Sequence, residues 1–320
     1  MAVRVSSAEP SAADAPTSFS ARTRLLVVAP HPDDETIANG LLIQRVRAAG
    51  GEVGIVLLTD GDNNPWPQRW MERRLYIDAD GRRRWGARRH AELLLAMQRL
   101  GLPASALQQL HWPDLGVTCR LLSAPRAAVA ALTAAITAFR PDVVVAPAMG
   151  DRHPDHGSAH VLVRLALAPM PSAPTLLTYM VHGSESAAPM LHIGGSPAEQ
   201  TAKRFALSAH RSQLVLSGGR VQRLSDRAER FFAVPRERTG PGGALPWRPP
   251  ALLHPWLRLS LVDAAGAQTW RWREAPLRRS DAGGYQLPPH GEPVASPRFA
   301  YLSLAVPSPW IFDHWGWCEL

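Results

Sequence analysis

The first two thirds of the chain alternates short apolar runs with longer amphipathic stretches. The runs are rich in β-branched residues and are bounded by turn-forming residues, which is typical of strands buried on both faces. In the stretches between them, apolar residues recur at helical spacing. The runs predict five strands, at 24–29, 53–59, 107–112, 142–146 and 175–181. The stretches predict helices at 35–49, 87–100, 123–139 and 156–167.

This alternation predicts an α/β fold with a Rossmann-like, doubly wound and mostly parallel sheet. An order such as 3-2-1-4-5 makes the first and fourth strands neighbours. In sheets of this kind, ligands bind beyond the carboxyl ends of the strands, where the strand order reverses. The loops after the first and fourth strands are therefore the predicted place for a functional site.

The stretch 62–86 is polar and rich in Arg and Trp, and we expect it to be an irregular excursion over the surface. Either its tryptophans contact a substrate or they take no part in binding. They are Trp66, Trp70 and Trp85.

The chain changes character near residue 239, where a Gly- and Pro-rich stretch resembles a linker. Segments with period-two alternation and many Trp, Tyr and Val residues follow, which is the pattern of antiparallel strands. The expected organisation is a disordered leader at 1–22, a main domain at 23–238 and a small C-terminal β-rich appendage at 239–320.

Composition narrows the functional classes. The leader lacks the apolar centre of a signal peptide, and no stretch approaches the run of about 20 apolar residues that a membrane helix needs. We therefore expect a cytoplasmic protein without stable membrane insertion. Two cysteines are too few for a disulfide framework or a Cys-rich metal site. The net charge of +8 does not indicate a nucleic-acid partner, because the arginines are scattered and Lys203 is the only lysine.

Two polar clusters follow the first and fourth predicted strands. They are His31-Pro32-Asp33-Asp34-Glu35 and His153-Pro154-Asp155-His156. A catalytic zinc site takes three protein ligands and leaves a fourth position for water, whose pKa falls to about 7. A further carboxylate then takes the proton from that water. Either cluster alone is weak evidence, but two of them at neighbouring strand ends predict a metal-dependent hydrolase.

Together, the VVAPHPDDE and HPDH segments resemble the PIG-L/LmbE-like family of zinc-dependent N-acetylglucosaminyl deacetylases. The likeness extends over about residues 24–235. Supporting pieces are Thr59-Asp60-Gly61, Arg89 with Glu92, Asp114-Leu115-Gly116, and Lys203 followed by His210-Arg211-Ser212-Gln213.

The resemblance implies a role for each matched residue. One Zn²⁺ would be held by His31, Asp34 and His156. Asp33 would deprotonate the zinc-bound water, and His153, as an imidazolium, would stabilise the tetrahedral oxyanion. Asp155 would orient or tune His153. Iron remains an alternative metal in the cell, because His and Asp ligands do not exclude Fe²⁺.

Four further residues have two interpretations each. Arg89 and Asp114 are both candidates to contact sugar hydroxyls at the rim of the pocket. The alternative is that Arg89 belongs to a solvated helix face and that Asp114 is a turn residue. Glu35 either holds a metal-binding histidine or caps the following helix. His160 lies one helical turn after His156 and is an alternative ligand.

The expected function is removal of an N-acetyl or other N-acyl group from an amino sugar or glycoconjugate. One alternative is an amidase of the same architecture that acts on a larger amide or thiol conjugate. An alternative of another class is a non-catalytic carbohydrate-binding protein. A nucleotide-binding protein is disfavoured, because no Gly-rich phosphate loop follows the first strand. The sequence predicts no oligomeric state.

Overall fold

A computed structural model describes residues 18–183, 187–236, 243–280, 283–288, 297–306 and 312–320. Most of the predicted leader, residues 1–17, lies outside these ranges, as does the start of the predicted linker at 239–242.

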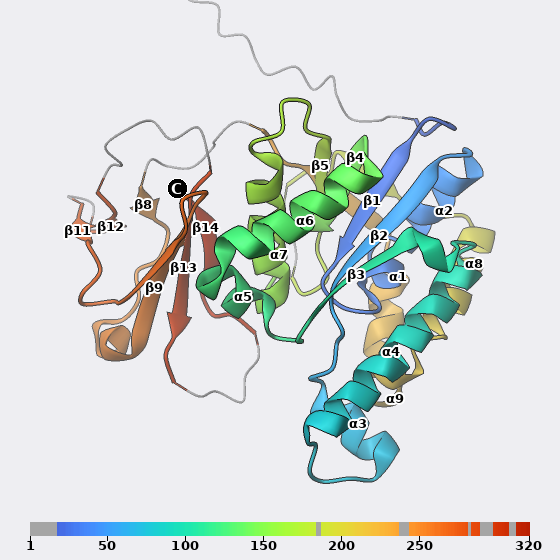
Figure 1. Cartoon of the computed structure of the whole chain (residues 1–320), viewed down its shortest axis with the longest axis horizontal. Coiled ribbons are helices and arrows are strands. Elements are labelled where there is room, and N and C mark those ends of the chain that lie inside the picture. Colours follow the sequence, from blue (N-terminus) through green and yellow to red (C-terminus); the bar gives the residue numbers. More distant parts are fainter. Residues whose placement is uncertain (1–17, 184–186, 237–242, 281–282, 289–296, 307–311) are drawn as a thin grey trace, which may run out of the picture.

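The centre of the protein is a seven-stranded sheet of order β3-β2-β1-β4-β5-β7-β6 (Figure 1). The first five of these strands run parallel, and β7 and β6 add an antiparallel edge. The predicted order 3-2-1-4-5 is therefore confirmed. The strands are Arg24–Ala29 (β1), Glu52–Thr59 (β2), Leu107–Trp112 (β3), Val143–Pro147 (β4), Thr175–Tyr179 (β5), Leu191–Ile193 (β6) and Glu229–Ala233 (β7).

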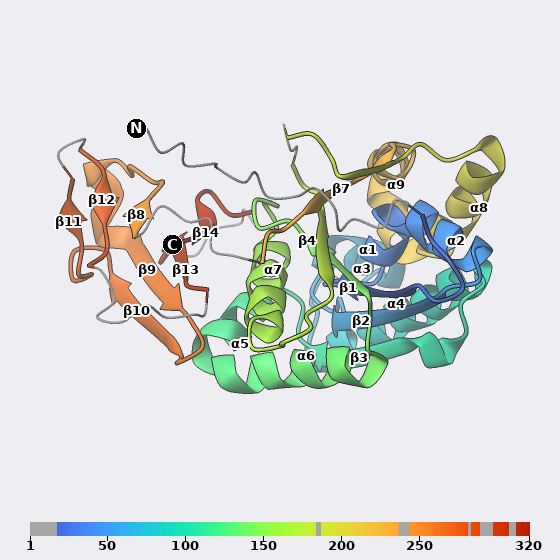
Figure 2. The ribbon, with the colours of Figure 1, turned by 90° about the horizontal axis from the view of Figure 1, so that it is seen from above.

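Both faces of the sheet are covered, because side chains along β1 alternate between two apolar cores. Leu26 and Val28 face a core that includes α6 and α7. Leu25 and Val27 face a second core that includes α2 and α4. Figure 2 shows these helix layers on opposite sides of the sheet. The helices are Asp34–Ile37 (α1), Gly40–Ala48 (α2), Pro65–Glu72 (α3), Ala79–Arg99 (α4), Val117–Ser123 (α5), Pro125–Phe139 (α6), Pro154–Leu167 (α7), Pro197–Leu207 (α8) and Arg211–Ser225 (α9).

The prediction of an irregular excursion at 62–86 is wrong, because α3 and the first part of α4 lie there. Each helix has a local start signal. Pro65 occupies the first turn of α3, and the Asp78 side chain accepts a hydrogen bond from Gly81 N at the start of α4. The predicted helix at 123–139 is confirmed as α6, which Pro125 begins, whereas the short helix α5 before it was not predicted.

The C-terminal part forms two antiparallel sheets, of orders β10-β9-β13-β14 and β11-β12-β8. This confirms the predicted β-rich region. Its strands are Ala244–Leu245 (β8), Leu257–Val262 (β9), Ala267–Arg271 (β10), Arg278–Arg279 (β11), Tyr285–Gln286 (β12), Phe299–Leu304 (β13) and Gly316–Glu319 (β14). Short 3₁₀ helices occur at Ala104–Ala106 and Ala251–Trp256.

None of the single helices in the described ranges has the length and apolar character to cross a membrane. The bent pair α5–α6, with 117° between its two parts, passes that test by length and composition only.

A buried ion pair fixes the start of α2. Lys203 Nζ lies 2.6 Å from Glu229 Oε1, and both side chains are almost fully buried. The Glu229 carboxylate also accepts hydrogen bonds from the backbone N–H groups of Leu41 and Leu42, at 2.8 and 2.9 Å. A carboxylate at this position satisfies unpaired N–H groups and complements the helix dipole. A Cβ atom at Gly40 would come within 2.9 Å of the Lys203 side chain, so this close approach requires glycine.

The Lys203→Met variant should lower the free energy of unfolding by about 3–5 kcal/mol, because it leaves the Glu229 carboxylate buried without its cation. Urea denaturation measures this loss. The matched control is Arg204→Met on the same helix, whose ion pair with Asp226 is largely exposed. That change should cost less than about 1 kcal/mol. An equal loss of free energy of unfolding in the two variants would show that the buried pair stabilises the protein no more than the exposed pair does.

Candidate active site

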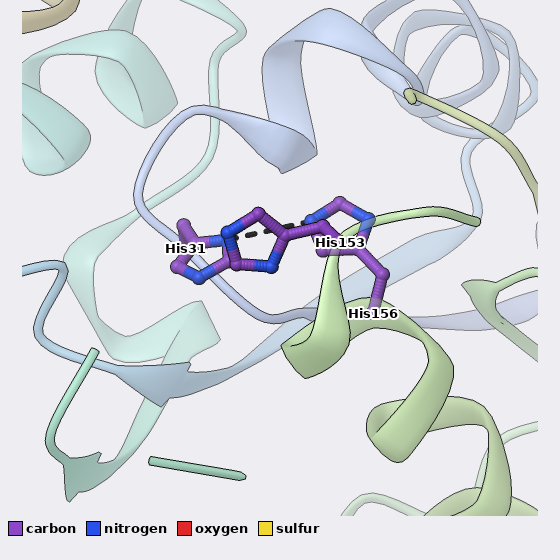
Figure 3. A group of neighbouring side chains, drawn as sticks. All are labelled: His31, His153 and His156. Atoms are coloured by element: carbon purple, nitrogen blue, oxygen red, sulfur yellow. Dashed lines mark hydrogen bonds between the residues drawn. The ribbon is translucent and has the colours of Figure 1, made fainter. Parts of the chain in front are cut away.

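The two polar clusters converge at the carboxyl edge of the sheet. β1 and β4 pair in parallel, so the loops that follow them leave the same edge side by side. His31 lies in the first loop and Asp34 begins α1. His153 precedes α7, and His156 lies in its first turn. Figure 3 shows the three histidine rings gathered in one place.

Three donor atoms form a nearly equilateral triangle. His31 Nδ1 lies 3.4 Å from Asp34 Oδ2, and His156 Nε2 lies 3.3 Å from both of these atoms. Tetrahedral ligands at about 2.0–2.1 Å from one zinc ion are separated by about 3.3–3.4 Å. The donor set and its spacing therefore fit Zn²⁺. All three side chains are buried.

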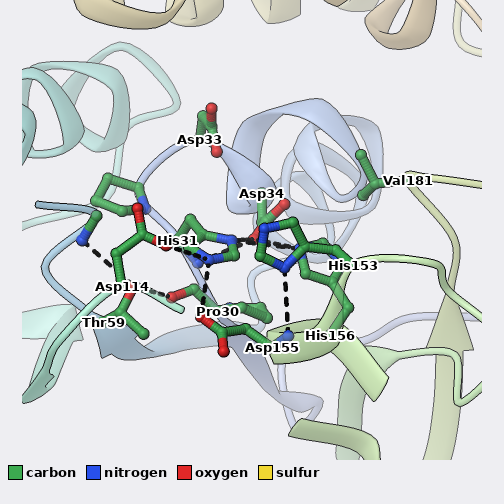
Figure 4. Close-up of polar contacts among 12 residues, drawn as sticks. Pro30, His31, Asp33, Asp34, Thr59, Asp114, His153, Asp155, His156 and Val181 are labelled. Carbon is green, nitrogen blue, oxygen red and sulfur yellow. Dashed lines mark hydrogen bonds and ion pairs between the residues drawn. The ribbon is translucent and has the colours of Figure 1, made fainter. Parts of the chain in front are cut away.

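Carboxylates behind the triangle orient its histidine rings. Asp151 Oδ2 lies 3.2 Å from His156 Nδ1, on the far side of the ring from Nε2. His31 Nε2 lies 3.2 Å from Asp114 Oδ1 and 3.3 Å from Asp155 Oδ2 (Figure 4). A carboxylate that binds the outer nitrogen of a histidine fixes its tautomer and leaves the inner nitrogen free as a ligand.

The electrostatic field at the triangle favours positive charge. Burial opposes the charged form of His156, but Asp34 and Asp151 outweigh that cost and raise its pKa to about 10. Burial also opposes the charge on His31, yet the neighbouring carboxylates raise its pKa well above the usual value. Burial alone would raise the pKa of Asp34, but His156 and His31 hold it well below the usual value. A divalent cation at the triangle complements this field.

Asp33 lies beside the triangle without joining it. Its backbone has φ 134° and ψ −24°, a strained region for a residue with a Cβ atom. The backbone N–H of Asp33 donates a hydrogen bond to Glu35 Oε2 at 2.9 Å, which supports this conformation. The carboxylate lies 3.6 Å from Arg89 Nη2. Burial raises the pKa of Asp33 to about 6, although Arg89 acts in the opposite direction.

His153 differs from its expected charge state. Its ring centroid lies 4.5 Å from that of His31 and 5.1 Å from that of His156. Burial, together with these two rings, lowers the pKa of His153 well below the usual value, so its surroundings favour the neutral ring over the expected imidazolium. Its Nδ1 accepts a hydrogen bond from the Asp155 N–H at 3.3 Å, which places the proton of a neutral ring on Nε2.

Asp155 contacts a different histidine from the one expected. Its carboxylate binds His31 Nε2 and accepts hydrogen bonds from the N–H groups of Leu115 and Val117, at 2.8 and 3.1 Å. Only its backbone N–H meets the His153 side chain. Asp155 therefore ties the loop after β3 to the first polar cluster.

Arg89 is buried, so the interpretation of a solvated helix face is wrong. Its guanidinium donates hydrogen bonds to Gly61 O at 2.9 Å and Pro32 O at 2.7 Å. Asp114 is also buried, and its Oδ2 accepts a hydrogen bond from Asn63 N. Both side chains therefore border the triangle and the Asp33 loop. Contact of either residue with a sugar stays a prediction.

The structure resolves the alternatives for Glu35 and His160. Glu35 does not bind a metal-site histidine. Its carboxylate holds the Asp33 N–H at the start of α1 and lies 3.0 Å from His210 Nε2. His160 Nδ1 lies 3.1 Å from the carbonyl oxygen of Pro147, away from the triangle. Among the tryptophans of segment 62–86, Trp85 is buried in the protein, and Trp66 and Trp70 are largely exposed.

Sequence reasoning missed Asp151 and His182. Asp151 is buried and binds the side chains of both His156 and His182 at 3.2 Å. It also accepts hydrogen bonds from the N–H groups of His153, Val181 and His182. Its place two residues before His153 was the available signal. His182 follows β5 and joins the cluster because β5 lies next to β4.

The GlcNAc-PI de-N-acetylase (PIG-L) family matches the chain over residues 26–167, which include both polar clusters. The 1D-myo-inositol 2-acetamido-2-deoxy-α-D-glucopyranoside deacetylase of Mycolicibacterium smegmatis is 38% identical over 162 residues, which cover 47% of this chain and 55% of that relative. The protein of the same name from Rhodococcus jostii is 37% identical over 164 residues, with the same coverage of 47% and 55%. The chain thus spans about half the length of the curated relatives it matches.

Solved structures share the fold. The N,N′-diacetylchitobiose deacetylase from Pyrococcus horikoshii matches with a TM-score of 0.53 at 20% identity, over 67% of this chain and 84% of that one. The A40926 pseudoaglycone deacetylase matches with a TM-score of 0.53 at 18% identity, over 68% of this chain and 100% of that one. These structures show that the chain shares their fold, and the family match to PIG-L covers residues 26–167.

Proposed function

We propose that this protein is a zinc-dependent deacetylase that hydrolyses the N-acetyl, or another N-acyl, group of an amino sugar or glycoconjugate. The observation that carries the proposal is the triangle of donor atoms with Asp33 beside it. The relatives from Mycolicibacterium smegmatis and Rhodococcus jostii, which are named as deacetylases of an N-acetylglucosaminyl inositol, support this choice of substrate class. A cytoplasmic location and the absence of a nucleic-acid partner stay predictions.

His31, Asp34 and His156 are the proposed zinc ligands. Their donor atoms are mutually spaced for one tetrahedral ion and leave a fourth position for water or substrate. When bound, Zn²⁺ polarises a carbonyl oxygen and lowers the pKa of a coordinated water.

Asp33 is the proposed general base. It is not one of the three proposed ligands, it directly precedes Asp34 in the chain, and its pKa of about 6 suits a group that accepts a proton near neutral pH. Asp33 takes a proton from the attacking water as the new C–O bond forms. It then returns that proton to the nitrogen as the C–N bond breaks, which releases the amine and acetate.

His153 is the proposed oxyanion donor. In the tautomer that its contact with the Asp155 N–H favours, Nε2 carries a proton, which a neutral ring can donate to the carbonyl oxygen as negative charge develops there. Asp155 acts on this step through its backbone N–H, and its carboxylate holds His31.

Arg89 and Asp114 lie where a substrate would border the site. Arg89 already donates to the carbonyl oxygens of Gly61 and Pro32, so we assign it to holding the Asp33 loop. Asp114 is the proposed contact for a sugar hydroxyl. It is nearly buried beside His31, where an acceptor oxygen gives a hydroxyl a fixed direction.

Chelation should abolish activity, and Zn²⁺ should restore it. His156→Gln should bind far less zinc than the wild type, because it removes one of the three donors. The matched control is His160→Gln on the same helix, which should retain zinc because His160 contacts Pro147 O instead. Metal analysis after dialysis distinguishes the two, and equal zinc content in both variants would refute the ligand assignment. Reconstitution with Fe²⁺ tests the alternative metal.

The Asp33→Asn variant should keep its zinc but lose roughly 10²–10⁴-fold in kcat, because an amide cannot accept the proton from water. The measurement is acetate release from N-acetylglucosaminyl compounds, with the metal content determined on the same sample. Full activity in a zinc-loaded variant would show that another group is the base.

The Asp151→Asn variant should weaken zinc binding by about 10–100-fold, because it removes the carboxylate that orients His156. Competition with a chelator of known affinity measures the change. Asp142→Asn is the control, since Asp142 precedes β4 at the opposite edge of the sheet and binds Arg24 N. If Asp151→Asn binds zinc as tightly as the control, Asp151 does not orient the ligand His156.

A further inference from the structure

The C-terminal β region packs on the helix that carries the second polar cluster. Trp317 Nε1 donates a hydrogen bond to Ser158 Oγ at 3.0 Å, two residues after His156. Arg164 of α7 pairs with Glu319 of β14 at 2.7 Å. A Cβ atom at Gly157 would lie 2.9 Å from Trp317 Cδ1, so β14 approaches the helix too closely for any other residue. Figure 1 shows β13 and β14 beside α7.

The two regions also share an apolar core. Val262, Phe299, Tyr301 and Trp317 from the β region belong to the same buried cluster as the inner residues of α5 and α7. Burial of apolar surface between two units fixes their relative position. The β region is therefore held at a defined place beside the site.

Phe312 lies at the end of this contact, beside the histidines of the site. Its ring centroid is 6.2 Å from that of His153 and 5.4 Å from that of His182. The Arg152 guanidinium lies over the ring at 5.7 Å, a cation–π contact. The next residue, Asp313, donates its N–H to Arg152 O at 2.8 Å and accepts the Tyr301 hydroxyl at 2.6 Å. The main chain at Phe312 is thereby anchored from both regions.

Resting on the deacetylase function proposed above, we propose that Phe312 is a specificity-determining residue that forms an apolar wall against the amine portion of the substrate. The His153 ring contacts both the His31 ring, at 4.5 Å, and the Phe312 ring, at 6.2 Å between centroids. With His153 donating to the amide oxygen, Phe312 contacts the donor ring and not the three ligand atoms of the triangle. An acetyl group extends only one methyl from that carbon, so the amine portion is what reaches Phe312. A phenyl ring suits the apolar C–H face of a sugar or cyclitol ring.

The test compares the full-length zinc-loaded wild type with Phe312→Ala and Phe312→Leu. The substrates are 1D-myo-inositol 2-acetamido-2-deoxy-α-D-glucopyranoside, N-acetylglucosamine, and glucosamine carrying N-propionyl or N-butyryl groups. Phe312→Ala should raise KM for the inositol-linked substrate about tenfold and change kcat less than about twofold, because the contact is made equally in the ground and transition states. Phe312→Leu, which keeps apolar bulk, should lie between. The order of preference along the acyl series should stay that of the wild type.

The control is Leu252→Ala, an exposed position of the same β region, which should match the wild type. An unchanged KM in Phe312→Ala, or a change that follows acyl length, would overturn the proposal. If the wild type hydrolyses none of these amides, the proposed function fails. In that case, the affinity for the amine product, glucosaminyl-inositol, is measured by calorimetry and tests the role of Phe312 separately. Weaker binding to Phe312→Ala would support it, and equal or undetectable binding would overturn it.

Discussion

The site depends on the concentration of carboxyl groups at one buried point. Asp34 is a corner of the donor triangle, and four more buried carboxyl groups lie around it, namely Glu35, Asp114, Asp151 and Asp155. Each carboxylate accepts hydrogen bonds from backbone N–H groups. Buried negative charge is costly unless it is paired, and Arg89 supplies a permanent positive charge on one side. A divalent ion at the triangle would balance the remaining negative charge of these carboxylates.

The sheet brings these groups together through backbone geometry. Pairing of Leu25 with Val143 and of Val27 with Val145 sets the register of β1 and β4. The two loops then leave the sheet at the same level, and α7 begins at Pro154 with its first turn directed at the first cluster. The strain at Asp33 is a consequence of this convergence. A relaxed backbone there would remove the hydrogen bond between its N–H and Glu35, which joins the loop to α1.

The sequence was informative where a residue's role depends on local pattern. The apolar runs predicted five strands and their order, and the polar clusters at two strand ends predicted a metal site. The choice of His31, Asp34 and His156 as its ligands came from the family resemblance. It failed where the role depends on tertiary contact. The sequence left Arg89 as either a sugar contact or part of a solvated helix face, but its guanidinium is buried against the carbonyl oxygens of Gly61 and Pro32. His182 gains its contact with Asp151 only because β5 lies beside β4.

The segment 62–86 after β2 and the C-terminal β region were also predicted incompletely from the sequence, for two different reasons. Local signals at Pro65 and Asp78 were present for α3 and α4, but the density of Arg and Trp concealed them. Nothing local in the sequence marks Phe312, because its significance comes from Trp317 and Glu319 docking on α7. That docking has a mechanical consequence. The helix that presents His156 is packed against the sheet on one side and against β14 on the other. Any substitution that loosens the β region therefore acts on the orientation of a proposed ligand, although it lies about 160 residues away in the chain.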